Sequence, residues 1–117
     1  MGRILSVSYD ETLLHTREML LESRGYTVES ALGFTEGLEL CKQSDFGLFI
    51  LGHSIPPADK RALIDAFRSS CPGPIISLQK VSEPDVAGAD YYVDPFPESV
   101  LKVVGEILGG TGKAKRA

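Results

Sequence analysis

The sequence predicts a single α/β domain built on a doubly wound parallel sheet. Five apolar runs of strand length recur along the chain, and each is followed by a segment with helical or turn character. Near-continuous apolar runs are typical of strands buried on both faces, because right-handed crossover connections place helices on either side of a parallel sheet. The length of 117 residues suits one domain with one core.

The strands are expected at the apolar runs, which cover residues 4–7, 26–31, 48–51, 74–78 and 91–93. A first helix is expected over residues 11–24, because four leucines share one broad face and Gly25 can end it in a left-handed conformation. These leucines are Leu13, Leu14, Leu20 and Leu21. The second helix is expected over residues 35–43, where it buries Leu38 and Cys41.

Asp59 is expected to cap the third helix, since it follows Pro56 and Pro57 and precedes a helical apolar pattern. Residues 82–87 leave room for only about two turns, so a fourth helix should be short or irregular. The last helix has Pro97 in its first turn. Its apolar stripe is made of Val100, Leu101, Val104, Ile107 and Leu108. The domain thus spans residues 1–108, and residues 109–117 are expected to form a flexible tail.

Composition argues against several classes of function. The net charge of −4 repels nucleic acid, and the basic residues 113–116 neutralise too few phosphates to bind it. No apolar stretch reaches the roughly 20 residues that span a bilayer, and no secretion signal is visible, so a cytoplasmic protein without membrane contact is expected. Cys41 and Cys71 lack CxxC or metal-ligand spacing, which favours buried reduced thiols over a disulfide or a metal site.

Residues 4–7, 24–28, 48–51 with Pro56, 74–76 and 89–96 occur in an order and spacing that resemble the receiver domains of response regulators in two-component signalling. The resemblance covers about residues 3–108. It implies the flavodoxin-like receiver fold, with five parallel strands in the order 2-1-3-4-5. The first and last helices would cover one face of this sheet, and the other three would cover the opposite face.

The resemblance also implies which residues an active receiver needs for phosphoryl transfer. An aspartate accepts the phosphoryl group, an acidic pair holds Mg²⁺, a lysine binds the phosphate, and a Thr or Ser hydroxyl triggers the switch. Here the acidic pair falls on Ser8 and Tyr9, the phosphoacceptor on Gly52, the hydroxyl on Gln79 and the lysine on Asp94. All these positions depart from the family's pattern. We therefore expect a vestigial phosphorylation pocket with no catalytic residue, no metal and no cofactor, in a protein that is not an enzyme.

Further expectations concern the surroundings of this pocket. Tyr9 and Gln79 should partly fill it, with the Tyr9 hydroxyl bonded to Asp94 or Gln79. His53 should be a partly buried structural residue rather than a phosphoryl acceptor. The resemblance implies a cis peptide bond before Pro95.

A short fourth helix would leave apolar residues uncovered beside the fifth strand. Val81, Val86 and Tyr91 form a candidate docking patch there, unless they collapse onto the sheet. The expected partner is a protein, such as a kinase, a regulator or another signalling protein, and a homodimer is left open.

The preferred hypothesis is a degenerate receiver domain in phosphorelay-type signal transduction, acting as a phosphorylation-independent protein-interaction module. The alternative is a small-ligand-binding sensor domain with Ser8, Tyr9, Gln79 and Asp94 as polar contacts in the altered crevice at the strand ends. An unrelated flavodoxin-like enzyme would need a nucleophile or a phosphate-binding loop, and the sequence supplies no such motif.

Overall fold

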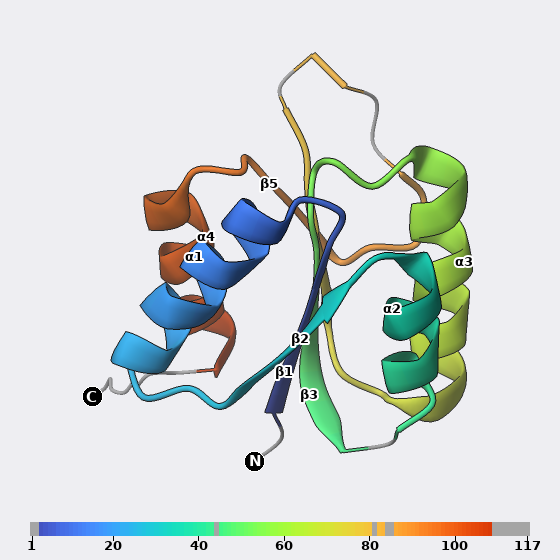
Figure 1. Ribbon diagram of the computed structural model, residues 1–117, viewed down its shortest axis with the longest axis horizontal. Helices are drawn as coiled ribbons and strands as arrows, with labels where there is room; N and C mark the ends of the chain where they lie inside the picture. The colour runs from blue at the N-terminus through green and yellow to red at the C-terminus, as the bar shows by residue number, and fades with distance from the viewer. Residues whose placement is uncertain (1–2, 44, 81, 84–85, 109–117) are drawn as a thin grey trace.

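Strands and helices alternate along the chain in the computed structural model, which describes residues 3–43, 45–80, 82–83 and 86–108 (Figure 1). In chain order the elements are β1 (Arg3–Ser8), α1 (Glu11–Ser23), β2 (Val28–Leu32), α2 (Phe34–Cys41), β3 (Phe46–Leu51), α3 (Pro57–Ser70), β4 (Ile75–Leu78), β5 (Tyr91–Val93) and α4 (Pro97–Leu108). Each predicted strand is present, with ends that differ by no more than two residues from the apolar runs.

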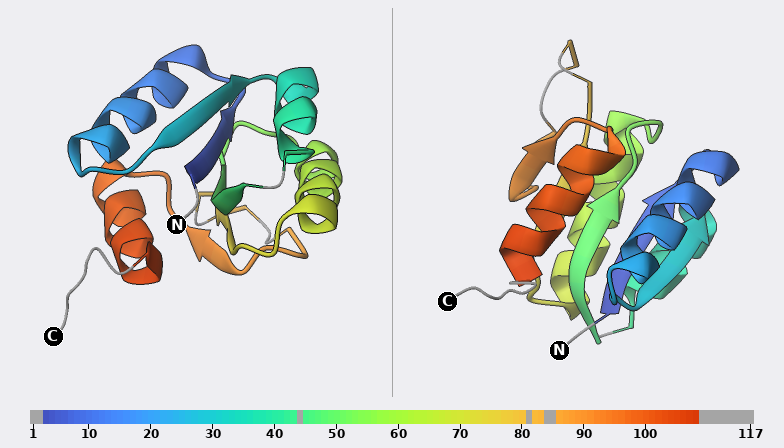
Figure 2. Two further views of the ribbon diagram at one scale, coloured as in Figure 1. Left: turned by 90° about the horizontal axis from the view of Figure 1, so that it is seen from below. Right: turned by 90° about the vertical axis from the view of Figure 1, so that its left-hand side faces the viewer.

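The strands form one parallel sheet in the order β2-β1-β3-β4-β5, which confirms the predicted fold class and strand order. Helices α1 and α4 cover one face, and α2 and α3 cover the other (Figures 1 and 2). The buried apolar side chains accordingly form two clusters, one beneath each helical layer. None of the helices in the described ranges has the length and apolar character that crossing a membrane requires.

The buried face of α1 consists of Leu14, Arg17 and Leu21, which follow one another at helical spacing. Leu13, predicted for this face, is instead 38% exposed. Asp10 caps the helix, since its carboxylate accepts a hydrogen bond of 3.0 Å from the Leu13 amide. A charged side chain therefore occupies the middle of a face that the sequence predicts to be apolar.

Helix α2 approaches both the sheet and α3 closely at Gly37. A Cβ atom on Gly37 would lie 3.1 Å from a methyl carbon of Val7 and 3.2 Å from one of Leu63. Cys41 is buried, as predicted, whereas Leu38 is only partly buried. The small residue in the middle of α2 thus sets how near the helix lies to its neighbours.

Helix α3 begins at Pro57, so the prediction that Asp59 caps it is wrong. Proline is favoured at the first helical position because its φ angle is already helical and its missing N–H has no partner there. The Lys60 amide donates to the Pro56 carbonyl at 2.9 Å, which closes the first turn. Asp59 lies within that turn, where a carboxylate interacts favourably with the helix dipole.

The described residues between β4 and β5 form turns and no helix. Val86 in this connection is buried in the cluster beneath α2 and α3. Its carbonyl accepts a hydrogen bond of 2.6 Å from the Tyr92 hydroxyl. The predicted short fourth helix is therefore replaced by turns over the part that can be described, while Val81 and the predicted tail, residues 109–117, lie outside the described residues.

The peptide bond between Asp94 and Pro95 is trans, so the predicted cis bond is wrong. An ordinary bond before proline favours trans by about 0.5–1 kcal/mol. The turn is supported by Asp94, whose carboxylate accepts a hydrogen bond of 3.1 Å from the Phe96 amide. Helix α4 then begins at Pro97, as predicted.

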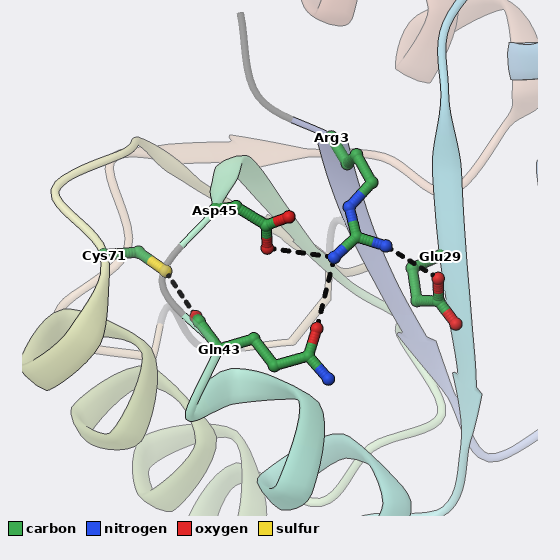
Figure 3. Close-up of polar contacts among 5 residues, drawn as sticks. All are labelled: Arg3, Glu29, Gln43, Asp45 and Cys71. Carbon is green, nitrogen blue, oxygen red and sulfur yellow. Dashed lines mark hydrogen bonds and ion pairs between the residues drawn. The ribbon is translucent and has the colours of Figure 1, made fainter.

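Arg3 joins several segments at the amino-terminal edge of the sheet (Figure 3). Its guanidinium donates to the carboxylates of Glu29 and Asp45, both at 2.9 Å, and to the side-chain oxygen of Gln43 at 3.1 Å. It also lies 4.7 Å from the centre of the Phe46 ring. The hydrogen bond from Arg3 holds the pKa of Asp45 below its usual range. These contacts are at the opposite end of the strands from the predicted pocket.

Both cysteines are free and buried, as predicted. The Cys71 thiol donates to the Gln43 carbonyl at 3.1 Å (Figure 3). Burial raises the pKa of the Cys41 thiol to about 12, so this thiol stays protonated at neutral pH.

Candidate functional site

The predicted pocket residues all lie at the carboxyl-terminal edge of the sheet. Ser8 is the last residue of β1 and Tyr9 follows it. Gly52, Gln79 and Asp94 directly follow β3, β4 and β5. Because these strands are parallel neighbours, the fold brings the ends of four segments together at the edge where open α/β sheets bind their ligands.

The Ser8 hydroxyl both accepts and donates a hydrogen bond to the backbone of the following loop. Its hydroxyl accepts from the Asp10 amide at 3.0 Å and donates to the Asp10 carbonyl at 3.1 Å. Asp10 itself is committed to capping α1. No group of three or more His, Cys, Asp or Glu side chains among the described residues could hold a metal ion.

Gly52 lies where the backbones of β1 and β3 approach each other. Its amide donates to the Val7 carbonyl at 2.9 Å. A Cβ atom at this position would lie 3.2 Å from the Val7 carbonyl oxygen and 3.3 Å from the Ser8 hydroxyl oxygen. These spacings are tight, so a side chain here would require its neighbours to move.

The Tyr9 hydroxyl donates to the Asp59 carboxylate at 2.9 Å, so the expected partners Asp94 and Gln79 are wrong. Its ring packs against the core cluster beneath α2 and α3, which draws the side chain from the end of β1 toward the start of α3. Burial, together with the bond to Asp59, raises the pKa of Tyr9 above its usual range. Asp59, predicted to be a helix cap, thus serves as the anchor of Tyr9.

Lys60 is a buried residue of this edge that the sequence did not single out. Its side chain is only 3% exposed, and its ammonium donates to the Ser77 hydroxyl at 3.0 Å and to the Leu78 carbonyl at 2.8 Å. Burial lowers the pKa of Lys60. A lysine in the first turn of α3 thus binds the last residues of β4. The one available signal was Ser77, a polar residue within an apolar strand.

A cavity of about 80 Å³ lies beside Lys60, lined also by His53, Ile55, Gln79 and Glu83. Gln79 is buried, and its backbone N–H donates to the Val93 carbonyl at 3.0 Å. His53 is partly buried, as predicted. The cavity has both polar and apolar lining residues, and of the predicted pocket residues only Gln79 is among them.

Exposed aromatic residues lie on and near β5, which is one of the two edge strands of the sheet. Tyr91 is 42% exposed, Tyr92 is 40% exposed and Phe96 is 66% exposed. Val86 was predicted either to join a docking patch beside them or to pack onto the sheet. It is buried in the core cluster, which agrees with the second expectation. Val81, the third predicted member, lies outside the described residues.

No protein-family model and no curated protein matches the chain. Among solved structures, it is similar to a CheY-like response regulator receiver domain protein from Methanospirillum hungatei, with a TM-score of 0.76 and 27% identity over 91% of this chain and 92% of that one. The chemotaxis protein CheY4 of Vibrio cholerae gives a TM-score of 0.72 and 22% identity over 92% and 98% of the two chains. A two-component response regulator from Clostridium difficile gives 0.77 and 21% over 92% and 96%. These structural neighbours show that the chain has the fold of CheY-like receiver domains.

Proposed function

We propose that this receiver-fold chain is a degenerate, cytoplasmic receiver domain of two-component signalling that acts as a protein-interaction module without being phosphorylated. It carries no catalytic residue in this proposal and binds another signalling protein through surface complementarity. Its five substituted pocket positions and its preserved sheet together support a scaffold that has kept its shape and lost its reaction.

The observation that carries the proposal is Gly52 at the end of β3. By resemblance, this is the position of the phosphoacceptor, and glycine has no side chain that could form an acyl phosphate. The closeness of Val7 and Ser8 leaves little room for one. Neither Ser8 nor Tyr9 supplies the carboxylate oxygens that Mg²⁺ requires.

Two contacts support a pocket held in one arrangement. The hydroxyl of Tyr9, after the end of β1, is bonded to Asp59 in the first turn of α3, and Lys60 is bonded to Ser77 and Leu78 at the end of β4. A switch needs an element with two arrangements of similar free energy. Hydrogen bonds between buried groups favour the single arrangement in which they form.

Treatment with a small phosphodonor tests the absence of phosphotransfer. The protein would be incubated with acetyl phosphate and Mg²⁺, and its intact mass measured beside that of a receiver domain with a complete acidic pocket. We expect the control to gain about 80 Da and this chain to stay unchanged. The same gain, mapped by peptide sequencing to a residue at the carboxyl end of the sheet, would falsify the proposal.

The exposed aromatic edge is the proposed contact surface, since aromatic residues are enriched in protein interfaces. Affinity capture from the native organism would compare the wild type with Tyr91→Ala and with Met19→Ala, a matched control that removes another exposed apolar side chain from α1. We expect a signalling protein to be retained by the wild type and the control and lost with Tyr91→Ala. Equal capture by all three proteins would place the contact elsewhere.

The alternative function, a small-ligand sensor in the strand-end crevice, has weaker support. Tyr9 is directed to Asp59, Ser8 is bonded to Asp10, and Asp94 is bonded to the Phe96 amide, so three of its four expected contacts are already used. The cavity beside Lys60 is the part of the crevice where a ligand would have to bind. A ligand found there in a crystal would favour this alternative.

A further inference from the structure

A second cavity lies on the other face of the sheet, between α1 and α4. Its volume is about 70 Å³, and its walls are mainly apolar, with Leu13, Leu20, Pro95, Pro97 and Leu101 among them. Both helices lie in front of the same face of the sheet in the right-hand view of Figure 2. This cavity contains none of the residues of the strand-end pocket.

Arg17 is the charged member of this lining. Its side chain is 9% exposed, and its guanidinium makes one hydrogen bond within the described ranges, a donation of 3.2 Å to the hydroxyl of Ser6. Ser6 is itself fully buried in β1. Because a guanidinium has five N–H donors in a planar fork, most of its donor capacity is not used by that one bond.

No carboxylate of the described residues forms an ion pair with Arg17. The ion pairs formed among the described residues involve Arg3 and Arg68 and never Arg17. Burial alone lowers the pKa of Arg17, to about 10, so the side chain is still protonated at neutral pH. A largely buried cation without a counter-charge is costly, and the guanidinium nitrogens that Ser6 does not engage keep some solvent exposure. An anion that binds there would relieve that cost.

We propose that the cavity between α1 and α4 binds a small monocarboxylate with an apolar chain, whose carboxylate is held by Arg17. A single guanidinium matches a single negative charge and can bind a carboxylate through two parallel hydrogen bonds. The mainly apolar walls match a hydrocarbon chain, whose first carbons would fill the cavity of about 70 Å³ while the rest lies along the exposed part of Leu13. This site is independent of the proposed protein-interaction function.

Three ligands separate the contributions of charge and chain. Octanoate has both, octanol keeps the chain without the charge, and acetate keeps the charge without the chain. Each would be titrated into ¹⁵N-labelled protein and followed by amide chemical shifts. We expect octanoate to shift signals of α1 and the start of α4 in a saturable manner, with an affinity at least about tenfold higher than that of octanol or acetate. Equal affinity for octanoate and octanol would overturn the proposal, as would no saturable octanoate binding.

Variants of Arg17 test the guanidinium itself. Arg17→Met keeps the apolar stem of the side chain and removes the charged guanidinium, so octanoate should bind at least about tenfold more weakly while octanol binding stays the same. Arg17→Lys keeps the charge without the fork and should give an intermediate affinity. Arg61→Met, an exposed position on α3, is the matched control and should bind as the wild type does. Undiminished octanoate binding by Arg17→Met and Arg17→Lys, both checked for folding by circular dichroism, would contradict the proposal.

Discussion

Two buried cations lie on opposite faces of the sheet, and each is bonded to a serine of a strand. Arg17 donates to Ser6 in the layer beneath α1 and α4, and Lys60 donates to Ser77 in the layer beneath α2 and α3. Both serines are fully buried. A buried charge requires hydrogen-bond partners, so these serines explain how each layer accommodates one long basic side chain.

Replacement of Lys60 by Met tests the cost of burying the ammonium group. Burial lowers the pKa of Lys60 in the folded state, whereas the unfolded chain has the ordinary lysine value of about 10.4. Between these two pKa values the unfolded state binds more protons, so the unfolding free energy of the wild type gains a contribution that rises with pH. Lys60→Met lacks this contribution. Urea unfolding should therefore show the wild type gaining stability relative to Lys60→Met from neutral pH to about pH 10.

The control for this measurement is Lys102→Met, since Lys102 is exposed on α4. The difference in unfolding free energy from the wild type should change more with pH for Lys60→Met than for this variant, because Lys60 is buried and Lys102 is exposed. Equal changes for the two variants would show that the ammonium of Lys60 is not penalised by the folded protein.

Among the secondary-structure elements, the connection from α3 to β4 passes very close to the start of β3. A Cβ atom on Gly73 would lie 2.6 Å from the carbonyl oxygen of Gly47, which is part of the backbone and cannot turn away. We expect Gly73→Ala to lower the unfolding free energy by about 1–3 kcal/mol. Urea denaturation followed by circular dichroism would measure the change.

Gly105 within α4 provides the opposite case. The nearest atom to a Cβ atom there is the Tyr26 hydroxyl oxygen at 3.9 Å, which is ordinary contact. Alanine is favoured over glycine within a helix, so Gly105→Ala should raise the unfolding free energy by about 0.5–1 kcal/mol. Unchanged stability of Gly73→Ala would contradict the assigned role of close backbone approach at Gly73, and destabilisation by Gly105→Ala would contradict the open space at Gly105.

The elements that could be predicted are those in which the local sequence signals agree with the position of the segment in the fold. β3 and α4 both have long apolar patterns, and Pro97 marks the start of α4. The start of α3 was misplaced because Asp59 and Pro57 both carry helix-start signals, and the proline lies at the earlier position. The bond before Pro95 is trans and not cis as expected, because a family resemblance cannot show which isomer one particular turn adopts.

The candidate site was only partly predictable for a related reason. The positions of Ser8, Gly52 and Gln79 follow from the ends of parallel strands, so the sequence locates them. The contact between Tyr9 and Asp59 joins residues fifty positions apart and depends on how α3 packs. Arg17 and Lys60 have long apolar stems, and a helical pattern scored by residue type assigns such residues to the solvent-facing side.

Over the whole molecule, stability should decrease from the centre of the sheet toward β5. Strands β1 and β3 are paired on both sides, whereas β5 has three residues and one paired edge. In hydrogen exchange followed by mass spectrometry, β1 and β3 should be the most protected strands, and β5 should exchange sooner. If the strand-end pocket does not accept a phosphoryl group, acetyl phosphate with Mg²⁺ should leave this pattern unchanged. Altered protection at the end of β4 or in β5 after that treatment would indicate a working switch.

Enclosure of the Lys60 amine also has a consequence for covalent chemistry on the protein. An acylating reagent needs an uncharged amine that it can approach, and here the nitrogen is screened by the chain and engaged by Ser77 and Leu78. Acetylation of Lys60 therefore requires α3 to part from β4 first. The extent of labelling at this one lysine would then report how often that separation happens while the rest of the molecule remains native.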